Sequence, residues 1–235
     1  MSKNILLAAV AALSLGACAS PYVATPYDRA SASISTIAML DDSVPPEPIA
    51  FEVASAGSNF GLIGALVDAG IQASRQDAVK DALEAHGFDA EAVLEARMAR
   101  ALEAQGYDVA VLPGSDRQRR DFLVTYPGAP EGTQAYLDLV VTQYGYLSAG
   151  AFQPFRPHVG ATARLVSVED PSVVLMENVI ILNGMNVPEG VITLSANPEY
   201  VFQNREAMLA DPARLAAGIE DALNQVADTA AQLLR

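Results

Sequence analysis

The chain has 235 residues, of which 51% are hydrophobic and 18% are charged, and its formal net charge is −14 at pH 7. The acidic excess excludes a nucleic-acid-binding protein, because phosphate contacts require many Lys and Arg residues, and it argues against electrostatic adhesion to anionic lipids. The apolar fraction is too high for a disordered polyanion, and the length is sufficient for one sizeable hydrophobic core.

The N-terminus has the pattern of an export signal. A lysine precedes an apolar run over residues 5–15, which has the length of a signal-peptide core and is shorter than the ~20 residues of a membrane span. The run ends in Leu15-Gly16-Ala17-Cys18, with the only cysteine of the chain. This tetrapeptide resembles the lipobox of bacterial lipoproteins, which implies cleavage before Cys18 and acylation of its thiol and amine. The alternative is an ordinary secretory signal whose cysteine follows the cleavage site by chance.

Cleavage before Cys18 leaves 218 residues and changes the net charge to −15, because Lys3 is lost and no acid is lost. No thiol remains for a disulfide after acylation, so we expect the domain to fold on its core alone. A triacylated cysteine supplies more than the two chains that stable anchoring requires. Ala19 and Ser20 follow, and neither is the aspartate that retains many lipoproteins in an inner membrane. We therefore expect a lipid-anchored protein on the periplasmic face of the outer membrane.

Composition divides the chain into three parts. Residues 1–17 are the signal peptide. Residues 18–33 are the lipidated cysteine and a flexible tether, since small, polar and proline residues predominate there. Residues 34–235 are a single periplasmic domain, and no stretch within them is long and apolar enough to span a bilayer.

Helical periodicity and capping residues mark several segments of the domain. Asp89 and Asp211 stand at N-cap positions, and Pro212 occupies the first helical position, where its missing N–H costs nothing. The segments predicted as helices are 60–74, its continuation or restart at 76–85, 89–105, and a long C-terminal helix over 211–234.

Alternating or continuous apolar runs predict six strands, and the last two form a hairpin. These runs cover residues 34–40, 49–54, 107–112, 136–147, 159–168 and 173–182. The order of elements predicts an α/β (α+β) fold, with a mixed sheet of about five or six strands and helices packed on one face.

Three stretches of this pattern resemble a group of periplasmic lipoproteins. Residues 102–109, 136–144 and 161–175 are similar to the curli-secretion and penicillin-binding-protein-activator lipoproteins. The resemblance implies an α/β domain like the N-terminal domain of the Tol translocation protein. It carries over no functional residue, and the Gly/Ala-rich segment 57–74 departs from the family pattern.

Small residues recur every fourth position in that segment, at Gly61, Ala65, Ala69 and Ala73. Such a face allows close backbone approach and is typical of associating helices. One interpretation is a homo-oligomer, or a membrane contact, through residues 57–74. The other, which the amphipathic pattern favours, is an alanine-rich core helix packed tightly on the sheet.

Two further features leave their interpretation open. Tyr144 and Tyr146 fall on one face of a strand, where they either line a groove for a protein partner or cover an edge of the core. The basic cluster of Arg117, Arg119 and Arg120 either contacts an anionic partner or belongs to a solvated loop, and the loop is favoured because charge runs are usually solvated.

No catalytic, cofactor or metal-binding signature stands out. The chain has two histidines, His86 and His158, and no cysteine beyond Cys18, whereas a zinc site needs three or four ligands. It also lacks the GxSxG and SxxK patterns of serine nucleophiles and the lysine of a phosphate loop. We expect structural or solvated roles for both histidines, and no cofactor.

These observations favour a non-enzymatic accessory or assembly factor of the cell envelope with an envelope protein as partner. A lipid-binding accessory lipoprotein of a transport system is the first alternative, and it requires an apolar cavity beside residues 60–74. An envelope hydrolase is the second, and it requires a cleft where Ser, His and carboxylate groups converge.

Overall fold

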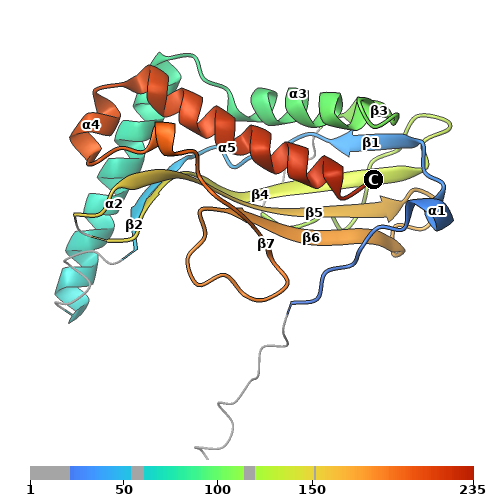
Figure 1. The fold of residues 1–235 in the computed structure, drawn as a ribbon, viewed down its shortest axis with the longest axis horizontal. Helices are drawn as coiled ribbons and strands as arrows, with labels where there is room; N and C mark the ends of the chain where they lie inside the picture. The colour runs from blue at the N-terminus through green and yellow to red at the C-terminus, as the bar shows by residue number, and fades with distance from the viewer. Residues whose placement is uncertain (1–21, 54–60, 114–119, 151) are drawn as a thin grey trace, which may run out of the picture.

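A single mixed sheet of seven strands forms the centre of the molecule (Figure 1). The computed structural model describes residues 22–53, 61–113, 120–150 and 152–235, and only the backbone over 61–72. The strands lie in the order β3-β1-β4-β5-β6-β7, and β2 also pairs with β4. Their bounds are β1 Thr36–Leu40, β2 Ile49–Glu52, β3 Asp108–Leu112, β4 Ala135–Ser148, β5 Phe155–Ser167, β6 Val174–Leu182 and β7 Ile192–Leu194.

The long strand β4 organises the sheet. Both β1 and β2 run parallel to it along the same edge, β1 from the Ile37–Ala135 pair and β2 from the Ile49–Gly145 pair. Gly145 has a φ of 137°, and a Cβ there would overlap the Ile49 carbonyl. Glycine at this position therefore permits the pairing of β2 with β4. On the other edge of β4, the strands β5 and β6 continue the sheet in antiparallel fashion.

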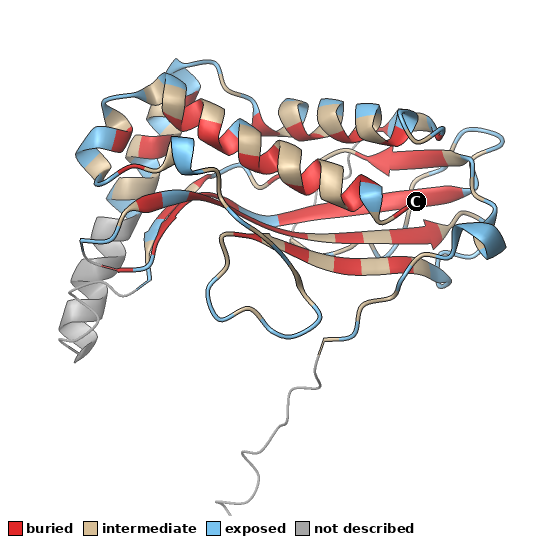
Figure 2. Ribbon diagram, in the orientation of Figure 1, coloured by how far each residue is buried: buried red, intermediate tan, exposed pale blue. Residues whose placement is uncertain are grey.

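Helices α3 and α5 cover one face of the sheet, and their sheet-facing sides are buried (Figure 2). The predicted caps are confirmed, because Asp89 accepts from Ala92 N at 3.0 Å and Asp211 accepts from Arg214 N at 3.1 Å. The helices are α1 Arg29–Ala32, α2 Gly61–Ala85, α3 Ala90–Glu103, α4 Arg205–Leu209 and α5 Pro212–Gln232, with a 3-10 turn at Pro198–Tyr200. None of the helices in the described ranges is long and apolar enough to cross a membrane.

Helix α2 is continuous rather than broken near residue 75. Its C-terminal half buries Val79 and Leu83 in the core, and an ion pair of 2.5 Å between Arg75 Nη1 and Glu52 Oε2 ties it to the end of β2.

The opposite face of the sheet, hereafter the second face, is covered at one end by residues 120–130. There Tyr126 stacks on Tyr136 with ring centroids 4.9 Å apart. The buried Asp138 carboxylate accepts from Leu123 N at 2.9 Å and from the Tyr126 hydroxyl at 3.2 Å. This segment forms a small second core with the strands beneath it. It does not extend over the other end of the second face.

The structure confirms the predicted mixed α/β fold with its long C-terminal helix, and it adds one strand to the expected five or six. The unpredicted β7 has three residues, too few to show a periodic pattern. Strand β5 also begins at Phe155 rather than at 159, and includes Pro157. The pairing of β5 with β6 starts only at Val159, so the missing N–H of Pro157 leaves no ladder bond unmade.

Candidate functional site

A pocket of about 420 Å³ opens on the second face of the sheet. One wall is β2, through Ile49, Phe51 and the adjacent Val53, and the other is the β6–β7 loop, residues 183–191. The floor is formed by side chains of the central strands. We call this site the second-face pocket.

The lining of the second-face pocket is mainly apolar. Leu147 and Ile181 lie in its floor, and Val187 and Pro188 lie in its loop wall. At the rim, Phe51, Val53 and Met185 are 40%, 48% and 37% exposed. Partly exposed large apolar side chains around a concave apolar surface are typical of a site that takes an apolar ligand.

The polar part of the floor is His158, which is buried and held on both sides. Its Nδ1 lies 3.2 Å from the carbonyl oxygen of Asn183, and its Nε2 lies 2.8 Å from Gln143 Nε2. A carbonyl only accepts, so Nδ1 carries the proton and Nε2 accepts from the Gln143 amide. Burial lowers the pKa of His158 below its usual 6.5, and the nearby carbonyls of Asn183 and Leu182 oppose this only in part. His158 is therefore a neutral floor residue, and neither ring nitrogen is left to activate a nucleophile.

The described lining of this pocket contains none of the predicted interaction residues. Cys18 lies outside the described residues. For Gly61, Ala65 and Ala69 the structure gives only the backbone of α2, and Ala73 is exposed. Self-association through residues 57–74 therefore stays a prediction.

Tyr144 and Tyr146 lie in the helix-covered core, with 5% and 0% exposure. Tyr144 borders a smaller hollow of about 280 Å³ between α2, α3 and the prolines that follow Val44. Burial raises the pKa of Tyr144 to about 12, with Asp89 and Glu47 adding to the shift. Their burial agrees with the interpretation that these tyrosines belong to the core.

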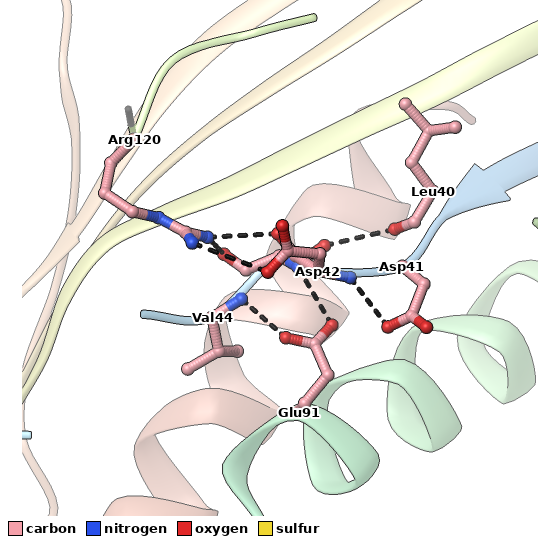
Figure 3. A network of polar contacts seen from close by, with 7 residues as sticks. Leu40, Asp41, Asp42, Val44, Glu91 and Arg120 are labelled. Atoms are coloured by element: carbon pink, nitrogen blue, oxygen red, sulfur yellow. Dashed lines mark hydrogen bonds and ion pairs between the residues drawn. The ribbon is translucent and has the colours of Figure 1, made fainter. Parts of the chain in front are cut away.

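A polar network holds the connection between β1 and β2 (Figure 3). Part of this connection lines the hollow beside Tyr144. The Glu91 carboxylate accepts from the backbone N–H groups of Ser43 and Val44 at 3.0 and 2.6 Å. Arg120 Nη2 donates to the carbonyls of Asp42 and Ser43 at 3.1 and 2.6 Å. Burial raises the pKa of Glu91, although the two N–H donors oppose the shift. The network is structural, because the Glu91 and Arg120 side chains both bind backbone groups of residues 42–44.

The remaining polar candidates are dispersed. Arg120 belongs to the network of Glu91, and Arg117 and Arg119 lie outside the described residues. His86 is exposed just after α2. Across the described parts of the chain, no three His, Cys, Asp or Glu residues come close enough together to hold a metal ion.

The second-face pocket has no counterpart in the sequence analysis. Its walls come from residues 49–53 and 181–188, which are far apart in the chain and carry no shared motif. An apolar cavity beside residues 60–74 was only what the lipid-binding alternative required, and no sequence pattern indicated a cavity at this position. No family model, curated protein or solved structure matches the chain.

Proposed function

We propose that the protein is a lipid-anchored, non-enzymatic accessory protein of the outer membrane that binds an acyl chain in the second-face pocket. Its anchor is the acylated Cys18. Of the functions that the sequence left open, lipid binding is the one that requires an apolar cavity. The second-face pocket is such a cavity, and its described walls come from β2 and the β6–β7 loop.

The observation that carries the proposal is the combination of an apolar lining with a neutral polar floor. The volume of the pocket, about 420 Å³, falls within the ~300–1,000 Å³ range of small-molecule sites. Gln143 keeps its second amide N–H and its Oε1 for hydrogen bonds to a carboxyl or ester group, and the neutral His158 beneath it adds no charge to the floor. No charged side chain lines the pocket among the described residues.

Binding of palmitate to protein carrying Cys18→Ser, measured by displacement of a fluorescent fatty acid, tests the pocket. Phe51→Glu and Met185→Glu place a carboxylate at the rim, where partial exposure keeps the folding cost low. Each should weaken binding by about tenfold or more, equivalent to ~1.4 kcal/mol or more. Val173→Glu is the matched control, because Val173 is 45% exposed and directly precedes β6, at the end of that strand away from the pocket. Equal affinities in all four proteins would overturn the assignment of the pocket.

Fractionation of cells tests the anchor separately. Cys18→Ser should release the protein from membranes, because loss of the acyl chains removes ~0.8 kcal/mol per buried CH₂. If this variant still sediments wholly with membranes after a salt wash, the lipid anchor is wrong.

A further inference from the structure

Residues 22–33 are docked on the domain rather than free. Thr25 and Glu177 of β6 exchange two backbone hydrogen bonds, each 2.9 Å long, and the Tyr22 hydroxyl donates to the Glu177 carbonyl at 3.2 Å. Further along, Asp28 caps α1 through the N–H groups of Ala30 and Ser31. The segment is therefore fixed to the sheet edge from Tyr22 onward.

The docking continues to the end of α3. Arg29 Nη2 donates to the Gln105 carbonyl at 3.1 Å, and the Arg29 guanidinium lies 4.7 Å from the centre of the Tyr107 ring. The stretch expected to be a flexible tether therefore contributes little length between the lipid and the domain.

The distance from the docked segment to the lipid is short. Tyr22 is four residues from Cys18, and four extended residues advance at most ~14 Å. This reach is about half of the ~30 Å diameter of a small domain. An acylated Cys18 therefore holds the surface around Tyr22 close to the membrane, whatever path residues 19–21 take.

That surface includes the β6–β7 loop. A Cβ on Gly190 of this loop would come within 3.0 Å of the Tyr22 carbonyl oxygen. The docked segment leaves the domain beside this loop, on the side away from α3 and α5 (Figure 1). Val23 is 78% exposed beside Tyr22, and Met185 is exposed in the loop. Glu189 is the one charged residue of the nine in the loop, in a chain with 28 acidic residues.

We infer that the surface formed by Val23 and the β6–β7 loop, here the loop surface, rests on the membrane that holds Cys18. The inference depends on the proposed lipid anchor. The loop surface exposes the apolar side chains of Val23 and Met185 and carries a single charge, Glu189, which suits contact with the interfacial region of a membrane. Because the same loop forms a wall of the second-face pocket, Met185 at the rim then lies against lipid, and acyl chains enter from that membrane.

The test uses the acylated protein in phosphatidylethanolamine/phosphatidylglycerol vesicles that contain a nitroxide-labelled lipid. Met185→Cys carries a fluorophore on the loop surface, and Ala96→Cys carries it on the exposed side of α3. Acylation blocks the thiol of Cys18, so each introduced cysteine is the one reactive thiol. We expect the label at 185 to lose most of its emission and the label at 96 to keep most of its emission.

Lengthening the tether supplies the control for orientation. An insertion of about twenty Gly/Ser residues between residues 21 and 22, with an r.m.s. span of ~25 Å, should restore much of the emission at 185. Equal quenching at both positions, or quenching that the insertion leaves unchanged, would overturn the inference while the protein stays bound to vesicles. Failure to bind vesicles at all would instead overturn the lipid anchor.

Discussion

Tyr146 and Gly218 meet in the core between β4 and α5. Tyr146 is fully buried, with its ring 5.5 Å from that of Phe202, and its hydroxyl has no hydrogen-bond partner among the described residues. A Cβ on Gly218 would overlap this hydroxyl and approach Tyr200 Cβ at 2.8 Å. Glycine at 218 therefore makes room for a phenol that the core holds without a polar partner.

Gly218→Ala should overpack this contact and lower the free energy of unfolding by ~1–3 kcal/mol. Tyr146→Phe removes the hydroxyl that lacks a partner, so we expect it to be neutral or stabilising. In the background of Tyr146→Phe, Gly218→Ala should lower the free energy of unfolding by less than it does in the wild type. The coupling energy between the two substitutions should reach ~0.5 kcal/mol or more. Urea unfolding of the wild type, the two single variants and the double variant measures these free energies. Strict additivity would contradict this account of the contact.

His158 gives the stability a pH dependence. Its folded pKa lies below 6.5, so the unfolded chain takes up the proton first as the pH falls. The contribution of neutral His158 is fully present above the unfolded pKa and declines below it, until the folded pKa is reached.

His158→Gln should therefore reduce the loss of unfolding free energy between about pH 7.5 and about pH 5.5, with a ceiling of ~1.4 kcal/mol per pH unit. His86→Gln is the control, because His86 is exposed, and it should follow the wild-type curve. Parallel curves for His158→Gln and the wild type would show that burial of this ring does not control its protonation.

At the scale of elements, the β1–β2 connection depends on α3. Both strands run parallel to β4 along the same edge, and the chain between them passes through a left-handed residue at Asp42, whose φ is 60°. The Glu91 carboxylate accepts from two successive backbone N–H groups there. This side chain thus fixes the offset between the two strands.

Glu91→Gln replaces one acceptor oxygen with an NH₂ group, which leaves one of the two backbone donors without its bond. We expect a loss of ~1–3 kcal/mol in unfolding free energy. Glu95→Gln, one turn along α3, should change stability by less than ~0.5 kcal/mol. Thermal and urea unfolding compare the two. Equal effects would mean that loss of charge on α3, rather than the bonds to Ser43 and Val44, determines the result.

The elements show how far sequence patterns reach. The helix α5 was predictable because its apolar stripe and its Asp211 cap are local signals. The start of β5 was not, because Pro157 is compatible with a strand only where no neighbour pairs on that side. The second-face pocket could not be predicted either, because Phe51 and Met185 are brought together only by the order of strands in the sheet.

At the scale of the whole molecule, the N-terminal segment connects distant parts of the fold. Thr25 extends the edge at β6, and Arg29 contacts the end of α3. Tyr27 packs against the main core. Tyr107, which lies under Arg29, donates through its hydroxyl to the Leu234 carbonyl near the C-terminus. Composition alone had placed the start of the domain at residue 34, because a single β-bridge between residues 25 and 177 leaves no periodic signal.

A chain beginning at residue 34 should therefore be less stable than one beginning at residue 22. It loses the two Thr25–Glu177 bonds, the Arg29 contacts and the packing of Tyr27. At ~0.5–1.5 kcal/mol net for each hydrogen bond, we expect a deficit of about 2–4 kcal/mol. Thr25→Pro in the longer chain removes the Thr25 N–H donor and leaves Arg29 and Tyr27 in place, so it should cost a smaller part of this. Calorimetric melting of the three proteins makes the comparison. Identical melting of the two chain lengths would show that residues 22–33 add nothing to the fold, and the short reach to the membrane surface would lose its structural basis.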